Sequence, residues 1–264
     1  MYDFKYQKAA SVADAAKSIG ADGEAKLVAG GMTLIPTLKQ RLAKPSALID
    51  LGGIAEMKGI RRDGNAIVIG AMTKHVDVAS SAEVKSAIPA LAELASHIGD
   101  PAVRNRGTIG GSIANNDPAA DYPSAVVALN ATVVTSKRRI AADDFFKGLF
   151  ETALGSDEIV TAVSFPIPEK AAYMKFPNPA SRYAIVGTFV AKTGGNVRVG
   201  VTGAGPCVFR WTEAEAALGK SWNGDALKSL TVKADGLNSD IHASSEYRAH
   251  LVGVMARRAV AKAG

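Results

Sequence analysis

Residues 26 to 51, KLVAGGMTLIPTLKQRLAKPSALIDL, alternate between extended and helical patterns. The apolar run at 26–29 predicts a short strand, which the glycine pair at 30–31 interrupts. Residues 32–41 then predict a helix, and ALIDL at 47–51 predicts a second strand. A strand, a helix and a strand at this spacing indicate a βαβ unit with parallel pairing and a right-handed crossover.

Further elements flank this unit. SVADAAKSIG at 11–20 predicts a helix, because Ser11 can cap its start and Gly20 can end it. Downstream, apolar spacing predicts a strand at 65–73, a helix at 82–98, a helix at 118–129, and strands at 131–136 and 158–165. This order indicates an α+β subdomain with mixed or antiparallel strands.

The last third of the chain has a different pattern. Thr193-Gly194-Gly195 separates two apolar runs at 183–191 and 196–205, which predicts a hairpin. Helices are expected at 212–218 and 245–263. The sequence therefore predicts a C-terminal region of antiparallel sheet and helices.

Two glycine-rich segments are the candidates for a ligand site. AGG at 29–31 stands where a strand turns into a helix, so its backbone N–H groups can face an anion. GTIGG at 107–111 repeats this chemistry beside the hydroxyls of Thr108 and Ser112. Each segment alone is also typical of a tight turn, and neither contains a Walker A or Rossmann pattern. Together, they can clamp one pyrophosphate from two subdomains.

Two aspartates follow the second segment. Asp117 is a natural N-cap for a helix that Pro118 begins. Asp121 lies one turn further on, and its carboxylate would repel a phosphate, so we expect it to accept hydrogen bonds from neutral donors. A carboxylate pair for acid–base chemistry is the competing interpretation, but no histidine or nucleophile stands nearby in the sequence.

Composition argues against several classes of protein. The net charge of +6 is scattered along the chain rather than gathered with aromatic residues, so nucleic-acid binding is not expected. Cys207 is the only cysteine, so the chain can form no internal disulfide and no cysteine-ligated zinc or iron–sulfur site. The histidines lack metal-ligand spacing and are expected at surface or hydrogen-bonded helix positions: His75, His97, His242 and His250. With no bilayer-spanning apolar run and no apolar signal core, the protein is expected to be cytoplasmic, or soluble behind a partner that carries any export signal.

The two glycine-rich segments resemble the two FAD motifs of one enzyme family. KLVAGGMTLIPTLKQRLAKPSALIDLGGI at 26–54 resembles the first FAD motif of the flavoprotein subunits of the molybdenum hydroxylases, the xanthine dehydrogenase and carbon monoxide dehydrogenase family. VRNRGTIGGSIANNDPAADYPSAVVAL at 103–129 resembles their second FAD motif. The resemblance continues through FFKGLFETALGSDEIVTAVSFPIP at 145–168 and SDIHASSEYRAHLVGVMARRAV at 239–260.

This resemblance implies a bipartite FAD-binding fold of the α+β class. The expected parts are a small βαβ subdomain at 1–53, a mixed or antiparallel α+β subdomain at 54–168, and a C-terminal flavoprotein domain of antiparallel sheet and helices at 169–264. FAD is expected in the cleft between the first two parts.

The resemblance also implies a medium subunit of an oxidoreductase. A large partner subunit would hold molybdopterin and oxidise the substrate, and a small partner subunit would hold two [2Fe–2S] clusters. FAD in this chain would pass the electrons to an external acceptor, in a dimer of heterotrimers. The alternatives are a self-sufficient flavin oxidoreductase that acts on its own small substrate, and an assembly module that has lost FAD.

Carried over residue by residue, the resemblance assigns a cofactor-binding set without a catalytic residue or a metal ligand. The set comprises Leu27, Val28, Ala29, Gly30, Gly31, Met32, Thr33, Leu34, Ile98, Thr108, Gly110, Gly111, Ser112, Asn115, Asp121, Val160, Lys175 and Tyr183. Taken from the residues alone, Ile98 and Val160 would be core residues and Lys175 a solvated charge. Met32 departs from the polar Gln or His of many relatives, which removes one side-chain hydrogen bond near the cofactor.

Overall fold

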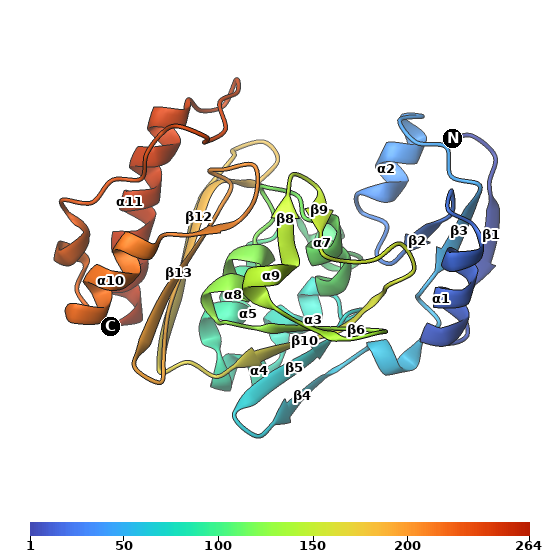
Figure 1. Ribbon diagram of the computed structural model, residues 1–264, viewed down its shortest axis with the longest axis horizontal. Coiled ribbons are helices and arrows are strands. Elements are labelled where there is room, and N and C mark those ends of the chain that lie inside the picture. The colour runs from blue at the N-terminus through green and yellow to red at the C-terminus, as the bar shows by residue number, and fades with distance from the viewer.

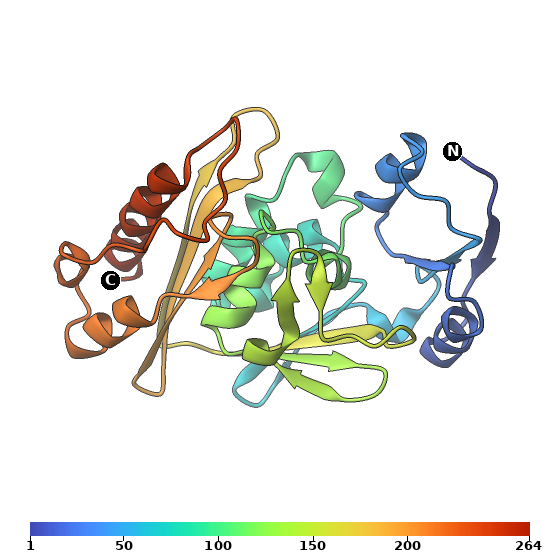
Figure 2. The same ribbon diagram turned by 45° about the horizontal axis from the view of Figure 1, so that its top comes forward.

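The computed structural model describes all 264 residues. Figures 1 and 2 show three main sheets side by side, with the N-terminal sheet at one end of the molecule and the C-terminal sheet at the other. None of the helices combines the length and the apolar character that crossing a membrane requires.

The N-terminal sheet confirms the predicted βαβ unit. Its elements are β1 (Lys5–Lys8), α1 (Val12–Ala21), β2 (Lys26–Val28), α2 (Leu34–Lys39) and β3 (Ala47–Asp50). β3 lies between β1 and β2 and pairs with both in parallel. The Ser11 hydroxyl caps α1 by accepting a hydrogen bond from the backbone N–H of Asp14 at 3.1 Å, as predicted.

The central sheet is antiparallel, with the strand order β4-β5-β10-β6-β7. Figure 1 shows α3, α5 and α8 gathered on one side of it. Its elements are η1 (Ala55–Met57), β4 (Ile60–Asp63), β5 (Ala66–Gly70), α3 (His75–Ser80), α4 (Ala82–Ala87), α5 (Pro89–Ser96), α6 (Pro101–Arg104), α7 (Ile109–Asn115), α8 (Tyr122–Ala128), β6 (Thr132–Thr135), β7 (Arg139–Ala141), α9 (Ala142–Phe145), β8 (Phe146–Gly148), β9 (Glu151–Thr152) and β10 (Val160–Pro166).

The C-terminal sheet is an antiparallel meander that lies between two layers of helices. Its elements are β11 (Lys170–Pro177), β12 (Ala184–Thr193), β13 (Asn196–Thr202), β14 (Phe209–Arg210), α10 (Thr212–Lys220), η2 (Gly224–Leu227) and α11 (Ser245–Ala263). The predicted hairpin is confirmed: Thr193 pairs with Asn196 around Gly194-Gly195, whose φ angles are +56° and +80°. Together with the antiparallel central sheet, this part confirms the predicted α+β class.

The helix predicted over 82–98 is wrong in one respect. The chain forms two helices, α4 and α5, because Pro89 has no backbone N–H to donate and its ring excludes helical geometry in the preceding turn. Ile88 between them has a φ of −139°. The apolar residues keep their helical spacing within α5, so Leu91 and Leu94 still lie in the core.

The helix predicted from Pro118 starts later, at Tyr122, and Asp117 does not cap it. The Asp117 carboxylate instead accepts a hydrogen bond from the N–H of Ala119 at 2.9 Å. The carbonyls that a helix would use are taken by the C-terminal sheet: Pro118 accepts from the N–H of Gly203 and Ala120 from the hydroxyl of Thr202. These bonds keep the segment before α8 irregular and join it to the C-terminal sheet.

Replacement of Gly200 in β13 tests how closely α8 packs on the C-terminal sheet. A Cβ added at Gly200 would lie 2.3 Å from the carbonyl oxygen of Ser124 in α8. Gly200→Ala should therefore lower the free energy of unfolding by about 1–3 kcal/mol. Gly219→Ala, where an added Cβ meets open space in α10, should raise it by up to about 1 kcal/mol. Denaturant titrations measure both, and equal effects would contradict this packing.

Candidate functional site

A cavity of about 590 Å³ lies where the N-terminal and central parts meet. Its wall is formed by the β2–α2 loop, by the chain from Ile98 through α7 to Asp121, by residues 158–160 and by the turn before β12. Every residue of the predicted cofactor-binding set except Lys175 lines it. The structure thus brings the two glycine-rich segments to one site, and contact of each residue with a cofactor stays a prediction.

The first glycine-rich segment offers a row of free hydrogen-bond donors. None of residues 29 to 33 donates its backbone N–H to another group of the protein. Gly31 has a φ of +72°, a left-handed conformation that glycine adopts without strain. Consecutive N–H groups of this kind before a helix form a concave site for an anion. The structure therefore agrees with the predicted backbone cradle at this segment.

The second glycine-rich segment works differently from the prediction. The backbone N–H groups of three of its residues are already used, since Ile109 donates to Thr73, Gly110 to Ala71 and Gly111 to the Thr108 hydroxyl. The reason is that α7 starts against the segment that follows β5, where the carbonyls of Ala71 and Thr73 receive two of these donors. The N–H groups of residues 109–111 are therefore not free for an anion, as a second backbone cradle would require.

Side chains of α7 face the cavity in place of that backbone cradle. Ser112 and Asn115 line the cavity, and neither side chain makes a hydrogen bond within the protein. Thr108, Ser112 and Asn115 are three to four residues apart, so they share one face of the helix. This face offers hydroxyl and amide groups to a polar ligand.

Gly110 serves packing rather than open space for a ligand. A Cβ added at Gly110 would lie 2.5 Å from the Cβ of Ala71 and 2.7 Å from its carbonyl oxygen. Gly30 is equally confined, because its added Cβ would lie 2.2 Å from the carbonyl oxygen of Arg106. These glycines let the walls of the cavity approach each other backbone to backbone.

Asp121 lies in the cavity wall within a buried network of charged and polar groups. Its carboxylate accepts a hydrogen bond from the Tyr173 hydroxyl at 2.5 Å and pairs with the Lys175 ammonium at 2.9 Å. Burial raises the pKa of the Asp121 carboxyl, and Lys175 offsets part of that rise. The expectation of a solvated Lys175 is wrong, since its side chain is only 3% exposed. Lys175 lies behind the cavity wall and reaches the site through Asp121.

Tyr183 lies at the cavity from the C-terminal side. The turn before β12 brings it there, and its side chain is 45% exposed. Burial of the phenol and the nearby Asp117 and Asp121 raise its pKa, so the hydroxyl stays protonated and able to donate.

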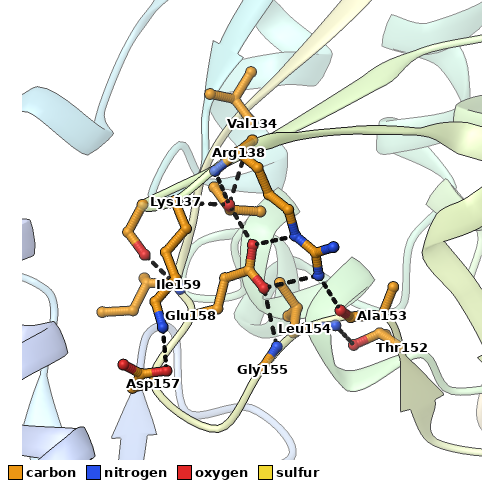
Figure 3. Close-up of polar contacts among 12 residues, drawn as sticks. Val134, Lys137, Arg138, Thr152, Ala153, Leu154, Gly155, Asp157, Glu158 and Ile159 are labelled. Atoms are coloured by element: carbon orange, nitrogen blue, oxygen red, sulfur yellow. Dashed lines mark hydrogen bonds and ion pairs between the residues drawn. The ribbon is translucent and has the colours of Figure 1, made fainter.

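Glu158 fixes the loop that leads into β10, and no motif or spacing in the sequence marks this role. Figure 3 shows its carboxylate facing Arg138, whose Nε lies 3.0 Å from Oε1, while the Thr135 hydroxyl donates to the same oxygen at 2.6 Å. The hydrogen bond from Arg138 lowers the pKa of Glu158 to about 2. The loop of residues 154–160 is thereby held against the cavity.

His75 is a second residue of the wall that sequence reasoning missed. It is 4% exposed, and its Nδ1 has no hydrogen-bond partner, so the predicted surface or hydrogen-bonded position is wrong. Its backbone N–H donates to Gly107 at 3.0 Å. Burial lowers the pKa of His75 to about 4, which keeps the imidazole neutral near pH 7.

The sequence matches two family descriptions that together cover almost the whole chain. Residues 2–168 match the "FAD binding domain in molybdopterin dehydrogenase", and residues 171–263 match the "CO dehydrogenase flavoprotein C-terminal domain". The chain is 35% identical to the nicotine 6-hydroxylase medium subunit of Paenarthrobacter nicotinovorans, over 98% of this chain and 97% of that one. It is also 35% identical to the carbon monoxide dehydrogenase medium chain of Hydrogenophaga pseudoflava, over 97% and 96% of the two chains.

Solved structures show the same similarity. A chain of the reconstituted CO dehydrogenase from Oligotropha carboxidovorans superimposes with a TM-score of 0.91 at 33% identity, covering 99% of this chain and 98% of that chain. A chain of quinoline 2-oxidoreductase from Pseudomonas putida 86 gives a TM-score of 0.89 at 28% identity, covering 99% and 97%.

Glu158→Gln is expected to destabilise the protein in a pH-dependent way. The folded-state pKa of about 2 lies below the ordinary value of 4.5, so the stabilisation is present above pH 4.5 and is lost as the pH falls through 2. After allowance for solvent around the half-exposed Arg138, the loss at pH 7 should be about 1–2 kcal/mol. Asp157→Asn breaks only the surface pair with Lys137 and should destabilise the protein less, because solvent screens an exposed pair. Urea titrations from pH 7 to pH 3 test this, and a difference that does not shrink with acid contradicts it.

Proposed function

The chain belongs to the FAD-binding medium subunits of the molybdenum hydroxylase family, as a flavoprotein subunit of a multi-subunit oxidoreductase. On that premise, we propose that it is the subunit through which electrons leave its complex. In this proposal, FAD receives electrons from iron–sulfur clusters of a small partner subunit and delivers them to an external acceptor. A large partner subunit holds molybdopterin and oxidises the substrate, within a dimer of heterotrimers.

The free N–H groups of residues 29–33 are the observation that carries the assignment of the cofactor site. They form the part of the cavity wall best suited to the two negative charges of the FAD pyrophosphate, because no protein acceptor competes for them. The cavity volume of about 590 Å³ lies within the usual range for ligand sites. Met32 supplies its backbone N–H to this row, so the missing polar side chain leaves the cradle intact.

Polar side chains around the cavity suit the uncharged part of the cofactor. Ser112 and Asn115 provide free donors and acceptors for hydroxyl groups, and Asp121 is an acceptor for ribityl hydroxyls. Ile98 and Val160 add apolar surface. When bound, FAD supplies the redox chemistry, and these side chains supply orientation and exclusion of water.

The titratable groups in the cavity wall favour electron transfer over a self-sufficient flavin enzyme. Asp121 is tied to Lys175 and Tyr173, and Glu158 to Arg138. Either carboxylate would have to leave these bonds to act as a general base, which costs free energy. The His75 imidazole is unpaired at Nδ1, but its lowered pKa of about 4 makes it a weak base. The single cysteine also requires that any iron–sulfur cluster lies in another subunit.

Gly30→Ala is expected to abolish most FAD binding. The added Cβ would push the first segment away from Arg106 and displace the N–H row, which we expect to weaken FAD binding by about tenfold or more. Gly23→Ala is the matched control, since its Cβ meets open space. Flavin absorbance per purified chain and titration of FAD into the apoprotein measure the effect. Equal FAD content in both variants would reject the cradle.

Transfer of electrons through the subunit can be followed in the intact complex. Dithionite, added below stoichiometry to the oxidised complex without oxygen, should first reduce the iron–sulfur clusters and then bleach the flavin as the clusters are reoxidised. A complex that contains Gly30→Ala should keep its clusters reduced, whereas one with Gly23→Ala should behave as the wild type. A wild-type flavin that stays oxidised beside reduced clusters contradicts the proposal.

A further inference from the structure

Asn116 connects the second glycine-rich segment to a hairpin at the cavity. It directly follows α7, it is fully buried, and its backbone adopts the left-handed conformation with a φ of 44° and a ψ of 48°. Asparagine is one of the few residues that adopt this conformation readily at a helix end. Its position is therefore tied to α7, which carries Ser112 and Asn115 into the cavity.

The side-chain amide of Asn116 holds both sides of the β8–β9 turn. Its Nδ2 donates to the carbonyl of Gly148 and to the carbonyl of Glu151, each at 2.8 Å. These carbonyls flank the two turn residues, Leu149 and Phe150, so both amide hydrogens serve one turn. Figure 1 shows this hairpin between the N-terminal part and the C-terminal sheet, next to α7.

The tip of the hairpin presents two apolar side chains that differ in one respect. Leu149 is 58% exposed and Phe150 is 56% exposed. Phe150 lines the cavity, whereas Leu149 does not. Phe150 also has a φ of +55°, a conformation that favours glycine and costs free energy for an aromatic residue. The clamp from Asn116 holds the turn in this unfavourable state with its ring at the cavity.

We propose that Asn116 is a positioning residue that holds Phe150 over bound FAD through the β8–β9 turn. The inference rests on the assignment of the cavity to FAD, and it adds a contact that the glycine-rich motifs do not contain. It also makes α7 and the hairpin one unit, so polar groups on α7 and an aromatic ring on the hairpin reach the cofactor together.

Titration of FAD into the purified full-length apoprotein tests the proposal. Phe150→Ala removes the aromatic contact and should raise the Kd of FAD about two- to tenfold. Asn116→Asp replaces the two donors by a carboxylate that faces two carbonyls, and it should raise the Kd by a similar factor. Leu149→Ala is the matched control and should bind as the wild type, whereas Phe150→Tyr, which keeps the ring, should restore binding.

A double-mutant cycle separates positioning from a general loss of structure. If Asn116 acts through Phe150, the double variant N116D/F150A should bind no more weakly than F150A alone. If the factors by which N116D and F150A each raise the Kd of FAD multiply in the double variant, the two residues act independently and the proposal is overturned. If N116D does not fold, Asn116→Gly takes its place in the cycle, because glycine accepts the left-handed backbone without supplying the amide.

Phe150→Gly separates the effect of Phe150 on the stability of the apoprotein from its effect on FAD binding. Glycine suits the φ of +55°, so the Tm of the apoprotein should stay equal or rise while the Kd of FAD rises as in F150A. An unchanged Kd in F150G, F150A and N116D overturns this inference and leaves the FAD site standing. Failure of the wild-type chain to bind FAD overturns the proposed function itself.

Discussion

The close approach of Gly30 to the carbonyl oxygen of Arg106 is the constraint on which the site depends. Only a hydrogen fits between these backbones, because a Cβ at Gly30 would lie 2.2 Å from that oxygen. Here the βαβ unit rests on the segment that leads into α7. The contact brings residues 29–33 and the polar face of α7 to the same cavity. The cavity thus arises from how two parts of the chain meet.

Two of the carboxylates in the cavity wall are paired before any ligand binds. Asp121 faces Lys175, and Glu158 faces Arg138, so each carboxylate repels an anion less than an isolated charge would. In the proposed FAD site, the backbone dipoles at residues 29–33 would contribute attraction for the pyrophosphate. Lys175 belongs to β11, so the C-terminal sheet takes part in the site although the glycine motifs lie elsewhere.

The parts of the fold that the sequence predicted are those with a strong local signal. The βαβ unit and the hairpin at Gly194-Gly195 have apolar runs and turn residues in agreement. The strand KYQK at 5–8 carried no such signal, because all its side chains are exposed and only pairing with β3 makes it a strand. α7 was missed because its glycines disfavour a helix, which packing on β5 overrides.

The site shows the same division between local motif and tertiary packing. The glycine-rich motifs supply a large part of the cavity lining. Whether each of their N–H groups is free or hydrogen-bonded depends on neighbours such as Ala71 and Thr73. Phe150 reaches the cavity on a turn that Asn116, at the end of α7, holds by two hydrogen bonds, and no spacing in the sequence reveals this.

Amide hydrogen exchange of the apoprotein and the FAD-loaded chain tests the proposed FAD site most directly. Residues 29–33 should exchange rapidly without FAD and become protected with it, while residues 109–112 should be protected in both states. Unchanged exchange at residues 29–33 on FAD binding would contradict it.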